Sequence, residues 1–340
     1  MDAAYTDALR LSYEEALGHS NALTDHISTD HFSAHYVDPP DWAIGPFQRD
    51  PSLTFRLDGQ WDDPTGVGWT SSAIFNPTMI ERGDDQHREL HLFYRASPRM
   101  ESTASRIGHA VRRDGVWHDD PANPVVYPTL GNETLGVEDP KVYEADGRYV
   151  LFYNAIRRDE EGETAVDIMA MVSDDLVSWE KIGLVVPLEV SLGWAKGAVV
   201  PRDEHGRAVR IGGEYLMYLS EGCGGRPMIG HSDDLVSWTF AEQPYLDLSP
   251  LPGSLFEVAC AVVRGDDLVL DFFYADENGD FAAAQAHYSV DAPFTQTGLH
   301  RGGSLAWGGL QRLDGRWSFA QGWDAPRGTR ELYVYKEVTM

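Results

Sequence analysis

Five short strand-like segments recur along this chain of 340 residues at intervals close to sixty residues. They begin near Asn76 (FNPTMI), Asp139 (VEDPKVY), Lys196 (KGAVVPR), Glu257 (FEVACAVV) and Trp307 (AWGGLQR), and the intervals are 63, 57, 61 and 50 residues. A repeat of this length is typical of the blades of a β-propeller and is too long for a solenoid of short units. Because the first strand of each propeller blade lines the central channel, the five segments are expected to converge on one axis.

The residues after each segment continue the pattern of a four-stranded blade. A turn containing Gly and Asp, such as Arg82-Gly83-Asp84, leads into a second apolar run, such as LHLFYRA from Leu90. Gly and Asp supply the backbone geometry of tight reversals. The string SDDLVSW then occurs twice, at residues 173–179 and 232–238. This repetition predicts an all-β fold, a five-bladed β-propeller over residues 71–340. The Trp that ends each string is expected to pack between neighbouring blades rather than to bind a ligand.

Residues 1–70 lie outside the repeat and are assigned to a separate N-terminal helix and arm. Apolar residues at helical spacing between Tyr5 and Leu17 predict one short amphipathic helix. This helix would pack on the propeller or on another subunit of a homo-oligomer. The stretch from Tyr36 to Gly66 is rich in Pro, Asp and Trp, and we interpret it as an extended arm that reaches the first blade.

The charge balance is strongly acidic, with 27 Lys and Arg against 54 Asp and Glu and a formal net charge of −27. Such a surface repels nucleic-acid phosphates, so no nucleic-acid partner is expected. No apolar stretch approaches the roughly 20 residues that span a bilayer, and the acidic start MDAAYTDALR lacks the features of a signal peptide. We therefore expect a cytoplasmic protein without a membrane partner. The two cysteines, Cys223 and Cys260, have neither disulfide nor metal-ligand spacing, and no metal or cofactor is expected.

Two acidic residues at the inner ends of blades are candidates for catalysis. Asp139, in VEDPK, either starts an Asp-Pro turn or presents a carboxyl in a partly desolvated channel, where its pKa would rise enough for general acid catalysis. Alternation puts Glu138 and Asp139 on opposite faces if the strand is regular. Glu257 is costly to bury without a partner or a purpose, so it is either in an ion pair with Lys196 or Arg95 or a second catalytic carboxyl. Two carboxyls facing a sugar-sized cavity suffice for glycosidic bond cleavage.

Other polar and aromatic residues of these blades are candidates for binding a sugar or an anion. The cations would hold an anion such as phosphate or neutralise the carboxylates. The amides would bond sugar hydroxyls, and the tryptophans, with Trp194 among them, would stack on sugar rings. The candidate substrate-binding residues are Asn76, Arg95, Arg106, Glu138, Asn154, Lys196, Trp307, Trp323 and Asp324.

Several strings, taken in order, resemble glycoside hydrolase family 130: FNP at Phe75, LFYRAS at Leu92, SRIGHA at Ser105, GVEDPKVY at Gly136, and then LFYNA, WAKGAVVP and SDDLVSW. That family comprises five-bladed β-mannoside phosphorylases and their hydrolytic relatives, and the resemblance extends over about residues 70–338. It implies an inverting enzyme that acts on β-linked, mannose-containing oligosaccharides, with Asp139 of the EDP motif as proton donor. In the phosphorylases of the family, Arg, Lys and His residues bind the phosphate that receives the mannosyl unit.

The sequence departs from the family pattern where the acceptor would bind. Lys141 replaces the Arg that commonly follows EDP, and YLSE, ending at Glu221, stands where a His-Arg pair is usual. Losing that cation weakens a phosphate site, and Glu221 or Glu257 would activate water instead. We therefore expect hydrolysis, with phosphorolysis and a non-catalytic carbohydrate-binding propeller as the alternatives. Asn76 occupies the position of the blade-one Asp of the related invertase and arabinanase clans, which disfavours a double displacement.

Overall fold

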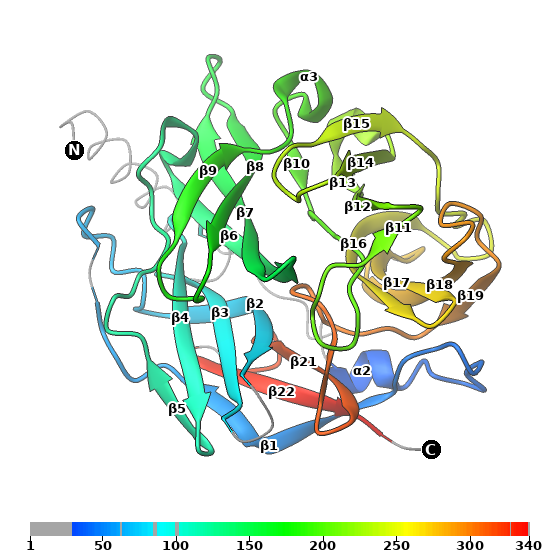
Figure 1. Ribbon diagram of the computed structural model, residues 1–340, viewed down its shortest axis with the longest axis horizontal. Helices are drawn as coiled ribbons and strands as arrows, with labels where there is room; N and C mark the ends of the chain where they lie inside the picture. Colours follow the sequence, from blue (N-terminus) through cyan, green and yellow to red (C-terminus); the bar gives the residue numbers. More distant parts are fainter. Residues whose placement is uncertain (1–28, 62, 84–86, 99–101, 327, 339–340) are drawn as a thin grey trace.

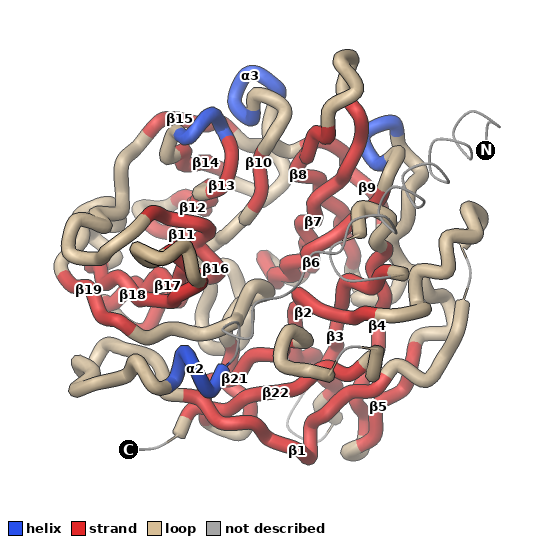
Figure 2. The backbone as a smooth tube through the Cα atoms, turned by 180° about the vertical axis from the view of Figure 1, so that it is seen from behind, coloured by secondary structure: helices blue, strands red, loops and turns tan. Residues whose placement is uncertain are grey.

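The computed structural model describes residues 29–61, 63–83, 87–98, 102–326 and 328–338. These residues form five four-stranded antiparallel sheets arranged around a central axis (Figure 1). The sheets surround the same axis when the molecule is seen from behind (Figure 2). The five-bladed β-propeller that the repeat predicts is therefore confirmed.

The first four blades follow the chain in order. Blade I consists of β2 (Ala73–Arg82), β3 (Glu89–Ser97), β4 (Arg106–Arg113) and β5 (Val116–Asp119). Blade II consists of β6 (Gly136–Ala145), β7 (Arg148–Arg158), β8 (Thr164–Ser173) and β9 (Glu180–Leu184). Blade III consists of β11 (Arg210–Ile211), β12 (Glu214–Leu219), β14 (Met228–Ser232) and β15 (Thr239–Glu242), with β10 (Ala195–Lys196) and β13 (Glu221–Gly222) as a separate pair. Blade IV consists of β16 (Ser254–Arg264), β17 (Asp267–Ala275), β18 (Phe281–Ser289) and β19 (Gly298–Arg301).

The fifth blade is closed by both ends of the described chain. Its strands are β20 (Gln311–Leu313), β21 (Arg316–Gln321), β22 (Glu331–Glu337) and β1 (Phe47–Arg56). The outer strand β1 runs antiparallel to β22, with Phe47 opposite Glu337 and Arg56 opposite Glu331. The segment interpreted as an arm toward the first blade therefore supplies a strand of the last blade, because this pairing satisfies backbone groups that an open edge of β22 would leave unpaired. The propeller sheet begins at Phe47, ahead of the boundary drawn at residue 70.

Helical structure is sparse in the described residues. It comprises α2 (Thr29–Ser33), α3 (Leu188–Ser191) and the single 3₁₀ turns η1 (Gly131–Glu133) and η2 (Cys223–Gly225). None of these helices is long and apolar enough to cross a membrane. The amphipathic helix expected between Tyr5 and Leu17 lies outside the described residues.

The two SDDLVSW strings form the same turn in blades II and III. Asp175 and Asp234 each accept two main-chain N–H groups of their own turn, at 2.9 and 2.7 Å. Trp179 then meets Phe93 of blade I edge-on, with the ring centroids 5.5 Å apart. Trp238 meets a phenylalanine of blade II in the same way at 6.1 Å. The prediction that these tryptophans pack between neighbouring blades is confirmed.

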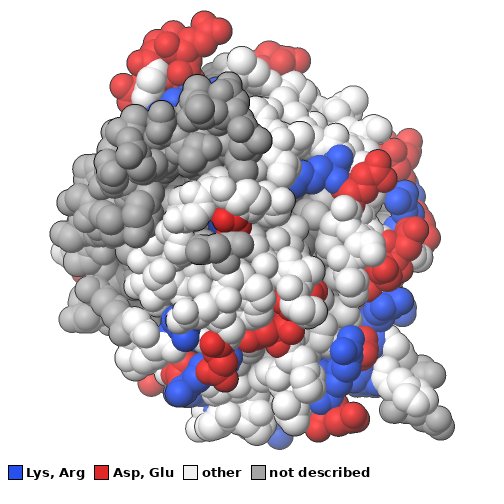
Figure 3. Space-filling model, turned by 90° about the vertical axis from the view of Figure 1, so that its left-hand side faces the viewer, with Lys and Arg blue, Asp and Glu red and all other residues white. Residues whose placement is uncertain are grey.

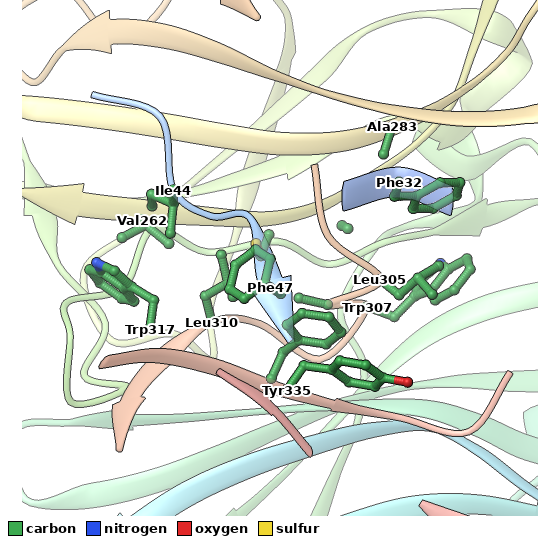
Figure 4. Packing of buried hydrophobic residues seen from close by; sticks show 14 of the residues in the cluster. Phe32, Ile44, Phe47, Val262, Ala283, Leu305, Trp307, Leu310, Trp317 and Tyr335 are labelled. Atoms are coloured by element: carbon green, nitrogen blue, oxygen red, sulfur yellow. The ribbon is translucent and has the colours of Figure 1, made fainter. Parts of the chain in front are cut away.

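The N-terminal segment packs into the seam between blades IV and V. Phe32 of α2, Ile44 and Phe47 are almost completely buried in one apolar cluster with Trp307 and Trp317 of the last repeat unit (Figure 4). The same cluster contains residues of β16, β17 and β18. Burying such side chains stabilises a fold by about 1.5–3 kcal/mol each. The segment ahead of β1 is thus part of the propeller core.

Charged side chains of opposite sign lie close together on the face that Figure 3 shows. Many of the ion pairs in the described chain are exposed, such as Arg148 with Asp174 at 3.0 Å, whose side chains are 56% and 80% exposed. Exposed pairs of this kind contribute at most about 1 kcal/mol. The buried ion pairs, such as that of Arg95 with Glu138, are therefore more informative about function.

Candidate active site

The inner strands of blades I and II share a backbone irregularity at their N-terminal ends. Asn76 and Asp139 both have left-handed backbone angles, with φ of 44° and 54°, and each precedes a proline. At these points the pairing register shifts, between Phe75 and Thr78 in one blade and between Glu138 and Lys141 in the other. A bulge of this kind re-aims side chains and is frequent next to functional sites. Gly197, in the corresponding segment of blade III, also has a positive φ of 69°.

The bulge changes where Glu138 and Asp139 point. A regular strand would place their side chains on opposite faces, but both carboxyls contact Arg95, at 2.6 Å from Glu138 and 3.2 Å from Asp139. The two side chains are therefore not on opposite faces, because the strand is not regular at this point. The Asp-Pro step can be read from the sequence, but the register shift in strand pairing cannot.

Asp139 is the centre of a hydrogen-bonded cluster from two blades. Its Oδ1 accepts from Asn76 Nδ2 at 2.8 Å and from Arg95 at 3.2 Å, and its Oδ2 accepts from Asn154 Nδ2 at 3.3 Å. Its side chain is 15% exposed. Burial raises the pKa of Asp139, but Arg95, Lys196 and the Asn76 hydrogen bond outweigh that effect, and the net pKa lies below the usual value. The expected rise in pKa is thus not found in the free protein.

Arg95 and Lys196 both form an ion pair with Glu138. The Glu138 carboxyl is 2% exposed and lies 2.6 Å from Arg95 and 2.9 Å from Lys196 Nζ. Burial lowers the pKa of Lys196, but Glu138 and Asp139 outweigh it and the net pKa is raised, so the ammonium stays charged. Arg95 also donates to Ser105 Oγ at 2.8 Å, and its guanidinium lies 4.5 Å from the centre of the Phe75 ring. The structural ion pair considered for Glu257 is therefore made by Glu138.

Glu257 is a second buried carboxyl at the inner end of blade IV. It is 7% exposed and accepts a hydrogen bond from Trp307 Nε1 at 2.9 Å. A Cβ at Gly197 would lie 3.0 Å from its Oε1, so a larger residue there would crowd the carboxyl. Burial raises the pKa of Glu257 to about 7, and the negative charges of Glu221 and Asp139 add to this against the opposing effect of Lys141.

Lys141 is buried among main-chain acceptors. Its Nζ donates to the carbonyl of Ala259 at 2.9 Å and to the carbonyl of Trp307. Burial lowers its pKa, which the charge of Glu257 partly offsets. The lysine that replaces the family's arginine thus links blade II to the inner strand of blade IV and to Trp307 of the last repeat unit.

Glu221 lies opposite Lys196 in the short β10–β13 pair. Its carboxyl accepts from Trp194 Nε1 at 3.2 Å, and Trp194 is 38% exposed. Burial raises the pKa of Glu221, Lys196 lowers it, and the net shift is upward. The candidate carboxyls thus come from blades II, III and IV, and their charges influence one another.

Arg106 and Asp324 are not part of this cluster. Arg106 is fully buried, pairs with Asp63, and donates to Thr65 Oγ1 at 2.9 Å and to the carbonyl of Leu135 at 3.3 Å. Asp324 accepts from the Thr29 main-chain N–H at 3.1 and 3.2 Å and from the Tyr335 hydroxyl at 2.5 Å. Both residues were predicted to bind substrate, and both instead hold N-terminal segments on the propeller, because buried polar groups need partners.

Trp307 and Trp323, like Trp194, act as hydrogen-bond donors. Trp307 is only 7% exposed, and its ring stacks on Phe273 with centroids 4.3 Å apart, so it is not the open sugar platform that was predicted. Trp323 is partly buried and donates its indole N–H to Asn76 Oδ1 at 2.6 Å. Both indoles thus support polar side chains of the site. Sequence alone did not single out Ser105, which holds the Arg95 side chain and could have been found from its place in SRIGHA.

A separate cavity of about 520 Å³ opens at the other ends of the inner strands. It is lined by turn residues of blades I, II and V and by the segment around Arg207. The charged groups there are paired with one another, as in Arg207 with Glu144 at 2.9 Å and Arg312 with Glu204 at 3.0 Å. The carboxyls of Asp139, Glu221 and Glu257, whose pKa values are shifted, converge at the opposite end, which is therefore the candidate active site.

A family profile described as β-1,4-mannooligosaccharide phosphorylase, that of glycoside hydrolase family 130, matches residues 54–254. The chain belongs to glycoside hydrolase family 130. This confirms the resemblance noted in the sequence, and the EDP motif lies within the matched residues.

Two curated relatives of this family 130 chain come from Thermoanaerobacter sp. (strain X514). A β-1,2-mannobiose phosphorylase is 31% identical over 125 residues, a stretch that covers 33% of this chain and 39% of the relative. A 1,2-β-oligomannan phosphorylase is 25% identical over 236 residues, or 66% of this chain and 72% of the relative. The first match thus spans well under half of that relative's length.

A solved structure shares the propeller. It is described with the statement that this family of mannoside phosphorylases contains glycoside hydrolases that target β-1,2-mannosidic linkages in Candida mannan. Its TM-score to this family 130 chain is 0.66 at 20% identity, and the superposition covers 87% of this chain and 95% of the other. At this identity the likeness supports the fold alone.

Proposed function

We propose that this family 130 chain is an inverting glycosidase that cleaves β-mannosides and uses water as the acceptor. The observation that carries the proposal is the Asp139 carboxyl held by Asn76, Arg95 and Asn154. Asp139 falls on the family's proton donor. It would donate its proton to the glycosidic oxygen directly or through a sugar hydroxyl.

The lowered pKa of free Asp139 is compatible with this role once substrate is bound. Burial is the largest influence on that pKa and acts upward. A sugar that covers the exposed 15% of the side chain would remove the remaining water and raise the pKa of Asp139 from its lowered value. The proton would therefore be taken up with substrate, in a site closed from solvent.

The ion pairs of the site favour water over phosphate as the acceptor. Four carboxyls converge there, from Glu138, Asp139, Glu221 and Glu257, while Arg95 and Lys196 are the cations that pair with two of them. A phosphate dianion would therefore have to displace the carboxylates of Glu138 and Asp139 from these two cations. Arg106, a further cation that the sequence offered for phosphate, is buried against Asp63.

Glu221 is the better of the two candidate bases. It is partly exposed, so water can reach its carboxyl, whereas Glu257 is 7% exposed and receives the indole N–H of Trp307. In an inverting enzyme the base activates a water on the face of the sugar opposite the acid. Glu221 would take the proton of that water.

Phosphorolysis remains the second candidate, because both curated relatives are named as phosphorylases. The deciding experiment incubates the protein with β-1,2- and β-1,4-mannobiose, with and without inorganic phosphate. Proton NMR then identifies the first product. We expect α-mannose at a rate that phosphate does not change. Phosphate-dependent formation of α-mannose 1-phosphate would establish the phosphorylase. Binding without turnover, measured by calorimetry, would establish a carbohydrate-binding propeller.

A further inference from the structure

The Asn76 amide lies between two polar partners from different blades. Its Nδ2 donates to Asp139 Oδ1 at 2.8 Å, and its Oδ1 accepts from Trp323 Nε1 at 2.6 Å. The side chain is 6% exposed, so water has little access to either end of the amide. Three residues far apart in sequence therefore form one continuous chain of hydrogen bonds into the site.

The chemistry of the partners fixes the direction of this chain. The indole N–H is only a donor, so the atom of Asn76 that faces Trp323 must be the amide oxygen. The amide NH₂ then has to face Asp139. The flipped amide would set its NH₂ against the indole N–H and its oxygen against the carboxyl, which leaves buried groups unsatisfied at both ends. Buried donors and acceptors without partners are rare because their loss of hydration is not compensated.

Trp323 is itself held in place by packing. Its ring meets Phe75 edge-on at a centroid distance of 5.4 Å and lies 5.6 Å from the Trp307 ring. Its main-chain N–H donates to Gln321 Oε1 at 2.5 Å. These contacts come from blade I and blade V, so the indole is oriented by the closure of the propeller.

We propose that Trp323 is a positioning residue for the reaction: its indole N–H orients the Asn76 amide, which then holds Asp139 Oδ1 as an acceptor. Among the described residues, Oδ1 accepts hydrogen bonds from both Asn76 and Arg95, whereas Oδ2 accepts only the longer bond from Asn154. Oδ2 is therefore the oxygen that carries the proton to the substrate. This inference rests on the proposed role of Asp139 as proton donor.

The test is Trp323→Phe, which removes the indole N–H and keeps an aromatic ring. The direct readout is the ¹³C titration of the Asp139 carboxyl, assigned by its loss in Asp139→Asn. Without a fixed Asn76 donor, the ionised carboxyl is less stabilised and the midpoint should rise by about half a unit to one unit. In an active enzyme, kcat should fall and the alkaline limb of the pH profile should move upward with the midpoint.

A double-mutant cycle with Asn76→Ala separates positioning from general damage. If Trp323 acts through Asn76, the double variant should shift the midpoint no more than Asn76→Ala alone. Trp117→Phe is the matched control, because it removes an indole hydrogen bond, to the Leu53 carbonyl at 3.2 Å, far from the site. An unchanged midpoint in Trp323→Phe, or one that moves equally in the control, overturns the proposal.

A second measurement follows the Trp323 end of this series of hydrogen bonds and does not require a folded Trp323 variant. The Trp323 indole N–H should exchange slowly with solvent in the unmodified protein and lose that protection in Asn76→Ala. Equal protection in both proteins would contradict the proposed hydrogen bond from Trp323 through Asn76 to Asp139. Neither readout requires turnover, so failure of the proposed function would appear separately, as an inactive protein whose Asp139 titration is still sensitive to Trp323.

Discussion

Glu257 should make the stability of this protein depend on pH in a way that one substitution removes. Its carboxyl has an ordinary pKa of 4.5, and burial raises that value to about 7 in the fold. Between these values the unfolded chain loses its proton while the folded chain keeps it. Because the unfolded state binds fewer protons there, the free energy of unfolding falls as pH rises. Each pKa unit corresponds to about 1.4 kcal/mol, so the total is about 3 kcal/mol.

The change to make is Glu257→Gln, which keeps an acceptor for the Trp307 indole but does not ionise. Between pH 4.5 and pH 8, the free energy of unfolding of the variant should rise by about 3 kcal/mol relative to that of the parent protein. The measurement is urea unfolding of both proteins across that range. His91 acts in the opposite direction over an overlapping range, since its pKa is lowered to about 4. The difference between variant and parent isolates Glu257, because the His91 contribution is common to both.

Glu160→Gln, on an exposed turn, is the control for losing one carboxylate. The difference in free energy of unfolding between this control and the parent should not change with pH. If the Glu257→Gln difference is equally flat, the carboxyl is not held protonated by its surroundings and the electrostatic account of the site is refuted. Activity gives a second result from the same protein. Loss of turnover beyond about 10²-fold would indicate that Glu257, and not Glu221, is the catalytic base.

Three further outcomes are expected. Asp139→Asn should lower kcat by about 10²–10⁴-fold, the usual range for a general acid. Steady-state kinetics measures the loss, and an unchanged unfolding midpoint shows that it does not come from misfolding. Full activity would remove Asp139 from the mechanism. Asp63→Asn should destabilise the fold by about 3–5 kcal/mol, because it removes the charge of the carboxylate that pairs with the buried Arg106, and kcat/KM of the folded fraction should be unchanged. A selective rise in KM would return Arg106 to the substrate site. Burial and His109 lower the pKa of His91 to about 4, so the free energy of unfolding of the parent should fall by about 3 kcal/mol through this residue as pH drops from 6.5 to 4. His91→Gln should lack this part of the fall. Identical urea profiles of the two proteins across that range would contradict it.

Much of the fold follows from the spacing of short segments. Each blade needs an inner strand followed by hairpins, so the interval near sixty residues and the repeated SDDLVSW turn predict the propeller without knowledge of any contact. The Trp of that turn packs between blades as expected, because its position in the repeat decides which neighbour it meets. The strand β1 was missed, since it pairs with the far end of the chain and belongs to no repeat unit.

The candidate site was predictable in part. The EDP motif and the period bring Asp139, Glu257 and Asn76 toward one axis, and these positions depend only on the order of the blades. The partners of single side chains depend on contacts across the ring. Arg106 pairs with Asp63, and Asp324 pairs with Thr29 near the other end of the chain.

The local sequence thus determines where each blade begins and which residues stand at its inner end, because turn chemistry and strand periodicity act over a few neighbours. The closed ring determines which charges meet, how deeply they are buried and, from these, which carboxyl is ionised. Burial and Coulomb interactions depend on distances in space that no spacing along the chain encodes. For that reason the lowered pKa of Asp139 and the raised pKa of Glu257 emerge only from the folded protein.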